Sequence, residues 1–322
     1  MQNVNNNMEN LANIAIIIPC YNEELVIQDS IVNISNTLDN LINKNLCSKS
    51  SFVLFIDDGS NDNTWEIIKQ NCIQQKNFKG KKLLFNSGHQ NALMAGIESV
   101  KNDCDLAITI DADLQDDLSV IKIMIENFYE GAEIVCGVKN TRKSDSYIKI
   151  FFSSFFYQIM KSFGIRLIKD HADFRLMSSN ILKKYSLYKE NNLLLRAITP
   201  LFHKNIKIIK YDLLPRKKGK SKYSFIKSLS LGVEGITSFS LVPLRLITFA
   251  GFFIFIISFL FSLNALYNKL IGNSIPGWAS ITVPLYALGG TIMFSLGIVG
   301  EYIGKIFMEV KKRPKYIIED EF

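Results

Sequence analysis

An acidic segment, IDADLQDD at residues 110–117, has the residue types and spacing that most directly predict chemistry. It follows an apolar run typical of a buried strand. At the end of an extended strand, side chains two residues apart point the same way, so Asp111 and Asp113 can offer their carboxylates to one hard cation. Mg²⁺ or Mn²⁺ held there would bind phosphate oxygens and neutralise a leaving diphosphate. The alternative is an acidic turn that caps the next helix, a role that suits Asp116 or Asp117.

Two further polar segments follow candidate strands, IPCYNEE at residues 18–24 and FIDDGSND at residues 55–62. Asp57 and Asp58 could accept hydrogen bonds from a base imide or a ribose hydroxyl, and Gly59 permits a tight turn that brings backbone close to a ligand. Alone, DDGS is an ordinary β-turn. It becomes evidence for a site only if it lies at the same edge of the sheet as the other acids.

The elements that must position these residues form an alternating pattern. Short β-branched runs and longer amphipathic runs alternate over the first 200 residues, which predicts a Rossmann-like, mostly parallel sheet covered by helices. Ligands of such sheets bind outside the carboxyl ends of the strands, so the polar segments predict one rim and one site. The expected strands are 14–19, 52–57, 82–85, 106–110 and 134–138, and the expected helices are 24–42, 63–72, 89–100 and 118–129.

The composition excludes several classes of protein. With 322 residues, 48% hydrophobic and 21% charged, the chain has enough apolar surface to fold and is not intrinsically disordered. Its 37 Lys and Arg exceed its 30 Asp and Glu, for a net charge of +7. The five cysteines lack the spacing of zinc or redox motifs, which predicts free thiols in a reducing cytoplasm. The first residues lack the basic-then-apolar order of a signal peptide.

Three common motifs are absent from the sequence. Gly219-Lys220-Ser221 resembles the end of a phosphate-binding P-loop, but Leu214 stands where that motif requires its first glycine. No G-x-G-x-x-G follows an expected strand, and H-E-x-x-H does not occur. These absences exclude kinase-like, dehydrogenase and zincin sites of the usual kinds.

Two uncharged stretches predict membrane-spanning helices near the C-terminus. One lies between Arg245 and Lys269 and the other between Lys269 and Glu301, and each is long enough to cross a hydrocarbon core about 30 Å thick. Basic residues flank the outer ends of the pair, whereas the connecting loop carries only Lys269. The positive-inside tendency therefore predicts a hairpin of two spans in the plasma membrane, with the large N-terminal region in the cytoplasm.

Three other segments indicate contacts with lipid or with other chains. Residues 203–232 contain nine Lys or Arg against one Asp, and their place before the spans favours anionic lipids over nucleic acid. The aromatic segment 147–163 fits either an interfacial helix or a core helix. Glycines of the second span, including Gly300 and Gly304, permit either a homo-oligomer or packing on the first span.

Six motifs, in this order along the chain, resemble those of family 2 glycosyltransferases of the polyprenyl-phosphate type. They are PCYNEE at 19–24, DDGSND at 57–62, NSGHQNAL at 86–93, DADLQDD at 111–117, DFRLMS at 173–178 and RKKGKSKYS at 216–224, followed by FSLVPLR and the two spans. The pattern is similar to that of bacterial enzymes that load glucose onto undecaprenyl phosphate, with dolichyl-phosphate mannose synthases as more distant relatives. The resemblance covers residues 13 to 315 approximately.

The resemblance implies a GT-A fold, a nucleotide-sugar donor, a divalent cation and a role for each matching residue. Nucleotide binding is implied for Pro19, Tyr21, Glu23, Asp57, Asp58, Gly88 and Asp111, and metal binding for Asp111, Asp113 and Gln115. Contacts with the lipid phosphate or in the basic loop are implied for Lys139, Arg142, Arg175, Gly219, Ser221 and Lys222. Catalytic roles are implied for Asp113, Asp173 and Arg216. Lys139 stands where the family often has Arg, so an ammonium group replaces a guanidinium group that could bind a phosphate through two hydrogen bonds.

Asp173 has two interpretations. The resemblance makes it a base or an orienting group near the acceptor, and the alternative is an ion pair with Arg175 or Lys169. A phosphate monoester has a second pKa of about 6 and needs no strong base at pH 7, which favours a positioning role. His89 and His171 have no neighbouring nucleophile and are expected to cap a helix or to lie in the core.

The resemblance predicts inverting transfer of glucose from UDP-glucose to undecaprenyl phosphate. The alternatives are the same reaction with mannose, an N-acetylhexosamine or an amino sugar, and a non-catalytic membrane scaffold. A polysaccharide synthase is disfavoured, since its usual Gln-x-x-Arg-Trp helix needs a tryptophan and none lies between Trp65 and Trp278. The expected organisation is a flexible N-terminus (1–12), a catalytic domain (13–215), a basic loop with juxtamembrane helices (216–244), a first span (245–266), an external loop (267–278), a second span (279–300) and a cytoplasmic basic tail (301–322).

Overall fold

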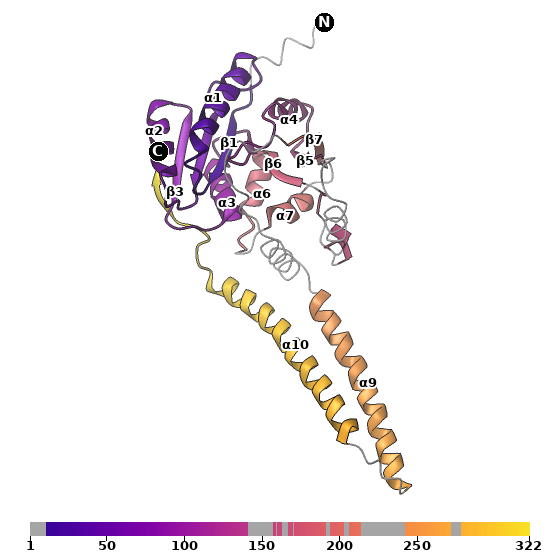
Figure 1. Cartoon of the computed structure of the whole chain (residues 1–322). Helices are drawn as coiled ribbons and strands as arrows, with labels where there is room; N and C mark the ends of the chain where they lie inside the picture. Colours follow the sequence, from indigo (N-terminus) through magenta and orange to yellow (C-terminus); the bar gives the residue numbers. More distant parts are fainter. Residues whose placement is uncertain are drawn as a thin grey trace. The chain divides into compact units, whose positions relative to one another are not determined.

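The computed structural model describes residues 11–140, 157–158, 160–162, 167–169, 171–190, 194–202, 206–213, 242–271 and 278–322. These residues fall into two compact units (Figure 1). The first lies within Met1–Gln158, Arg166–Ser224 and Pro314–Phe322, and the second within Ile159–Ile165 and Phe225–Arg313.

A mixed sheet forms the centre of the first unit. The strands in the described part of the chain are β1 (Ile14–Cys20), β2 (Phe52–Asp57), β3 (Phe78–Leu83), β4 (Leu106–Thr109), β5 (Ile134–Lys139), β6 (His171–Ser178), β7 (Lys207–Tyr211) and β8 (Ile318–Glu321). Their order is β7-β5-β6-β4-β1-β2-β3-β8. All of them run in one direction except β6 and β8, which are antiparallel to their neighbours. The expectation of a mostly parallel sheet is therefore confirmed.

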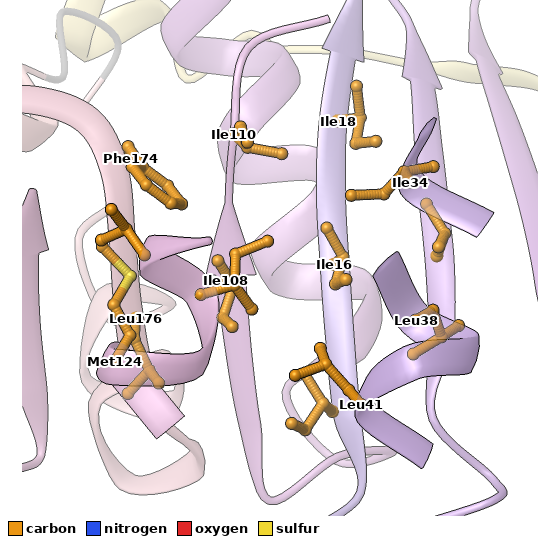
Figure 2. Close-up of a cluster of buried hydrophobic side chains, with 14 of the residues drawn as sticks. Ile16, Ile18, Ile34, Leu38, Leu41, Ile108, Ile110, Met124, Phe174 and Leu176 are labelled. Carbon is orange, nitrogen blue, oxygen red and sulfur yellow. The ribbon is translucent and has the colours of Figure 1, made fainter. Parts of the chain in front are cut away.

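Helices cover both faces of this sheet (Figure 1). One face carries α1 (Ile27–Asn43), α2 (Thr64–Gln74) and α4 (Val120–Tyr129), and the other carries α3 (His89–Val100), α6 (Ser179–Tyr185) and α7 (Leu195–Phe202). Figure 2 shows the core of the first face, where Ile16 of β1, Ile108 of β4 and Leu176 of β6 lie beneath the helices. Leu38 of α1 and Met124 of α4 cover them. Both faces are buried, which is why β1 is a continuous apolar run.

The opposite face depends on a close approach between α3 and β1. A Cβ added at Gly96 would lie 2.4 Å from Cγ2 of Ile17, so a side chain at this position has no room. Since α3 begins at His89, this contact also fixes the start of the helix beside the carboxyl end of the sheet. The expected helix 89–100 is confirmed.

The other expected elements also occur, with one strand displaced. The third strand is Phe78–Leu83 rather than 82–85. Its sequence, FKGKKL, contains three lysines among the buried residues Phe78, Gly80 and Leu83, so it lacks the apolar run of a buried strand. Gly80 lies under α2, where a Cβ would be 3.0 Å from Ile68. The position therefore carries no side chain that could mark it as part of a strand.

The C-terminal strand β8 corrects the expectation of a basic tail at 301–322. It pairs with the edge strand β3, and two ion pairs link the strands, Lys82 with Glu319 and Lys81 with Glu321, each at 2.8 Å. Phe322 continues the ladder, because its backbone exchanges two hydrogen bonds of 2.9 Å with Gly80. The last residues are thus acidic and belong to the first unit. Residues 1–10 of the expected flexible N-terminus lie outside the described residues, and Ala12 is buried.

The second unit contains two long helices, α9 (Val242–Leu270) and α10 (Trp278–Lys311). Within the described residues, one segment, Leu288–Lys311, is long and apolar enough to cross a membrane, and Val242–Ile254 is a shorter apolar helix. Apolar side chains of both helices, such as Phe253 and Phe294, are more than half exposed.

Candidate active site

The topology of the sheet brings the polar segments to one rim. β2 and β4 lie on either side of β1 and are parallel to it, so the chain leaves all three strands at the same edge. β6 is antiparallel to β4, with Arg175 opposite Thr109, so the first residues of β6 lie at this edge as well. The segments that contain Asp58, Asp111 and Asp173 are therefore neighbours.

Hydrogen bonds join the loop after β1 to the loop after β2. The backbone N–H of Asn22 donates to Oγ of Ser60 at 2.9 Å, and that of Glu23 donates to Oγ1 of Thr64 at 2.8 Å. Asn22 has a positive φ of 51°, which turns the chain at this point. The half-buried Tyr21 and Glu23 are thus held on a rigid part of the rim, together with the buried Pro19 inside β1.

Asp58 holds a third loop in place. Its two carboxylate oxygens accept hydrogen bonds from the backbone N–H groups of Ser87, at 2.7 Å, and Gly88, at 3.0 Å. Burial raises the pKa of Asp58 to about 6, although these two hydrogen bonds oppose the shift. Gly59 has a φ of 66°, and a Cβ there would lie 2.6 Å from the carbonyl carbon of Phe85. Gly59 is therefore required for contact between two loops, and Asp58 positions the backbone of Ser87 and Gly88 at the rim.

Asp57 has an oxygen available for a ligand. Its Oδ2 accepts a hydrogen bond from the backbone N–H of Ser60 at 3.1 Å, while its buried Oδ1 has no hydrogen-bond partner among the described residues. Burial raises the pKa of Asp57, which is the expected result when a carboxylate is removed from water. A buried acceptor of this kind is costly unless a donor reaches it, so it fits the imide of a nucleotide base.

Asp111 and Asp113 lie in the irregular turn that follows β4. Leu114 has a positive φ of 43°, and the backbone N–H of Gln115 donates to Oδ1 of Asp113 at 3.3 Å. The Asp111 side chain is 38% exposed. Partial burial and the nearby carboxylates of Asp173 and Asp116 raise the pKa of Asp111 to about 6. The described residues contain no cluster of three or more metal-ligating side chains, and Asp111 and Asp113 are the two carboxylates predicted as metal ligands in this turn.

Asp173 is at the centre of a charged cluster. Its side chain is only 4% exposed, and its two oxygens face Arg175, Arg196 and His89. Arg196 donates from Nη2 at 2.9 Å and from Nε at 3.3 Å, and Nε2 of His89 lies 3.2 Å away. Burial alone would raise the pKa of Asp173, but Arg196, His89 and Arg175 hold it well below its usual range. The ion pair with Arg175 that the sequence offers as an alternative is present.

Arg175 lies in the interior and not on a phosphate-binding surface. It is 1% exposed and donates to Oγ1 of Thr199 at 2.8 Å as well as to Asp173. Its assignment to the lipid phosphate is therefore corrected to a structural role. The reason is the direction of β6: Arg175 lies two residues further along this strand than Asp173, and therefore further from the rim.

Lys139 is also held by a protein carboxylate. Its Nζ lies 3.6 Å from Oδ1 of Asp116, which accepts a hydrogen bond of 2.5 Å from the hydroxyl of Tyr211. Asp116 is buried, and Asp117 makes the turn expected before α4 by accepting from the backbone N–H of Ser119 at 2.9 Å. Asp116 therefore ties the acidic loop to the end of β7.

Two charged residues at the rim were not predicted from the sequence as site residues. Nε2 of His89 lies between Asp173 and Asp111, at 3.2 Å and 3.7 Å, so its expected capping or core role is wrong. Arg196 of α7 has a side chain that is 45% exposed. His171, by contrast, is buried as expected, and burial lowers its pKa to about 3. The predicted residues Arg142, Arg216, Gly219, Ser221 and Lys222 lie outside the described residues.

Residues 15–190 match the model of Glycosyl transferase family 2, and the chain belongs to this family. It is a glycosyltransferase, and its mixed, mostly parallel sheet with helices on both faces is a GT-A-like α/β fold. This agrees with the family that the six motifs resemble.

Relatives match nearly the whole chain. The sequence is 44% identical over 306 residues to the Uncharacterized glycosyltransferase YkoT of Bacillus subtilis (strain 168), covering 95% of this chain and 91% of the relative. It is 36% identical over 269 residues to the SfII prophage-derived bactoprenol glucosyl transferase of Shigella flexneri, covering 83% and 86%. It is 33% identical over 308 residues to the Prophage bactoprenol glucosyl transferase homolog of Escherichia coli (strain K12), covering 95% and 98%.

Proposed function

We propose that this protein is an inverting membrane glycosyltransferase that moves glucose from UDP-glucose to undecaprenyl phosphate. Relatives named as bactoprenol glucosyl transferases support both the sugar and the lipid acceptor, since they match 83% and 95% of this chain. The product would be a polyprenyl-phosphate sugar that serves cell-envelope glycosylation.

The observation that favours a phosphate acceptor is that positive groups of the protein already occupy both carboxylate oxygens of Asp173. A sugar hydroxyl must lose a proton to attack, so an enzyme that glycosylates sugars needs a general base. Asp173 is buried, accepts from two arginines and faces His89, and its pKa is well below its usual range. It is a poor base. A phosphate monoester, with a second pKa of about 6, is already an oxyanion at pH 7 and requires none.

The proposed reaction is a single in-line displacement. An oxygen of the lipid phosphate forms a bond to the anomeric carbon, the bond from that carbon to the β-phosphate oxygen breaks, and UDP leaves with the electron pair. No proton is transferred. Negative charge spreads over both phosphate groups in the transition state, so positive groups at the rim and in the basic loop, including Arg216, would stabilise it.

The donor atoms at the rim fit a divalent cation. Asp111 and Asp113 supply hard carboxylate oxygens from one turn, which is the ligand type that Mg²⁺ and Mn²⁺ prefer. Such a cation would complete its coordination with diphosphate oxygens and would neutralise the charge of the departing group. Gln115 belongs to the same turn and positions Asp113 through its backbone N–H.

The second unit would hold the enzyme in the plasma membrane as a hairpin of two spans. In the described residues of Leu288–Lys311 no part of the apolar window is buried, whereas a core helix of a soluble protein would be. The charge pattern around α9 and α10 supports a cytoplasmic catalytic domain, where nucleotide sugars occur. Anionic lipids would bind the basic segment 203–232, and a homo-oligomer through the glycines of α10 stays a prediction.

The test is a panel of radiolabelled donors supplied to the detergent-solubilised protein with undecaprenyl phosphate and Mn²⁺ or Mg²⁺. UDP-glucose should label the lipid fraction, and omission of the lipid should remove the label. Label from GDP-mannose, a UDP-N-acetylhexosamine or an amino-sugar donor in its place would establish one of the alternative sugars. Binding of UDP without lipid labelling from any donor would overturn the reaction and support a non-catalytic scaffold.

The proposed topology predicts the sidedness of two engineered thiols. In a variant whose five native cysteines are replaced by alanine, Asn273→Cys should react with an impermeant thiol reagent added to intact cells, and Ser221→Cys should not. Permeabilised cells serve as the control and should expose both. Protection of Asn273→Cys in intact cells, with labelling of Ser221→Cys, would contradict a cytoplasmic catalytic domain.

A further inference from the structure

Two arginines share the carboxylate of Asp173, but they differ in exposure. Arg175 is 1% exposed and donates also to Thr199 and Tyr185. The side chain of Arg196 is 45% exposed. Burial and bonds to three protein side chains give Arg175 a structural role, whereas the half-exposed Arg196 can be reached by a ligand at the rim.

The geometry of Arg196 leaves one edge of its guanidinium unused. Nε donates to Oδ1 of Asp173 at 3.3 Å and Nη2 to Oδ2 at 2.9 Å, which is a side-on pair with both carboxylate oxygens. Among the described residues, the hydrogen bonds of Arg196 run from Nε and Nη2 to Asp173, and Asp111 and Tyr157 are its other electrostatic neighbours. The planar group is therefore held rigidly by one edge while the other edge remains available, which is the arrangement that suits bidentate recognition of a phosphate.

Two arginines share one carboxylate in this cluster. Asp173 contributes one negative charge, and Arg175 and Arg196 contribute two positive charges, so these three residues carry a net charge of +1. Asp111 offsets this charge, since it interacts electrostatically with Arg196 and lies 3.7 Å from Nε2 of His89. Arg196 therefore lies close to the acidic turn at the rim, where an anion would meet it.

We propose that Arg196 binds a phosphate oxyanion of the reaction, and that Asp173 is a positioning residue that fixes the guanidinium in place. The inference rests on the proposed function, since it takes a phosphate group to be present at the rim during transfer. The phosphate is that of the lipid acceptor or that of the departing nucleoside diphosphate, and both offer the same oxygens to the free edge of Arg196. Asp173 is then important because of Arg196 and not because it accepts a proton.

The test compares Arg196→Ala with Lys183→Ala in the full chain. Lys183 is an exposed residue of α6, so its variant removes one surface charge away from the rim and should behave as the wild type. Arg196→Ala should lower kcat/KM by about a hundredfold, as expected when one donor to a transition-state oxyanion is lost, with little change in unfolding temperature. Exogenous guanidinium should restore activity to Arg196→Ala, and Arg196→Lys should restore it only in part.

Binding measurements identify the phosphate. Weaker binding of UDP with Mn²⁺ to Arg196→Ala would place the contact on the donor, and a raised KM for undecaprenyl phosphate with unchanged UDP binding would place it on the acceptor. Wild-type turnover and wild-type affinity for both ligands would overturn the proposal, as would a loss that accompanies unfolding and resists guanidinium. If the wild type itself transfers no sugar to undecaprenyl phosphate, the proposed function fails, and the UDP and lipid-phosphate affinities still decide the role of Arg196.

A second variant tests the role of Asp173. If Asp173 acts through Arg196, the double variant Asp173→Asn/Arg196→Ala should be no slower than Arg196→Ala, because the two residues stabilise one contact. The pH profile of kcat should keep its shape in Asp173→Asn, provided that the variant is folded. Additive losses, or a change in the pH profile of the kind that removal of a general base produces, would contradict the positioning role.

Discussion

Asp113→Asn is expected to abolish sugar transfer while the fold and membrane insertion remain intact. Asn preserves the shape of the side chain but removes the negative charge that a divalent cation needs, and the loss of its charge stabilisation should slow transfer on the order of a thousandfold. Asp113 is half-buried in the turn after β4 and contributes little to the core, so the variant should still fold. The measurement is lipid labelling from UDP-glucose together with direct Mn²⁺ binding followed by electron paramagnetic resonance.

A matched control for this variant lies in the same acidic segment. Asp117 accepts a hydrogen bond from the backbone N–H of Ser119 and belongs to the turn before α4, so Asp117→Asn should retain transfer and Mn²⁺ binding. Excess chelator should abolish sugar transfer by the wild type and by Asp117→Asn alike. Undiminished turnover of Asp113→Asn, or of the wild type in chelator, would remove the cation from the mechanism.

The central strands and helices could be predicted from the sequence because burial on both faces leaves an unbroken apolar run. β1 and β2 are completely buried, and their sequences, IAIIIPC and FVLFID, therefore consist almost entirely of apolar residues. β3 could not be placed correctly, since it lies near the edge, where its lysines pair with acidic residues of β8 more than two hundred residues away. A partner so distant in sequence leaves no local signal.

The centre of the site was harder to predict because its pairs are non-local. β6, HADFRLMS, does alternate, with His171, Asp173 and Arg175 on one face and apolar residues on the other. A strand with charged residues on its buried face is predicted as a loop from sequence alone, because the groups that pair with those charges are not known. Those partners come from α3 and α7, so neither His89 nor Arg196 could be assigned to Asp173 from spacing alone.

Arg175→Met is expected to lower the free energy of unfolding of the catalytic unit by about 3 to 5 kcal/mol, the range found when one partner of a buried ion pair is removed. Arg175 and Asp173 are 1% and 4% exposed, so water does not replace the lost interaction. Thr199 also loses its donor. The measurement is urea unfolding of the full chain in detergent, followed by hydrogen exchange of peptides from β4 and β6.

The half-exposed Arg196 provides the control, since Arg196→Met breaks an ion pair with the same carboxylate and should cost no more than about 1 kcal/mol. The pH dependence is a second test of both variants. The pKa of Asp173 is lowered in the folded protein, so the stability it contributes is present above its unfolded pKa of about 3.9 and is lost as pH falls through the folded value. Removal of either arginine raises the folded pKa, since Arg196 and Arg175 both lower it, and the acid unfolding midpoints of Arg175→Met and Arg196→Met should therefore both move to higher pH. Equal unfolding of Arg175→Met and Arg196→Met in urea would show that the buried arginine contributes no more to stability than the half-exposed one.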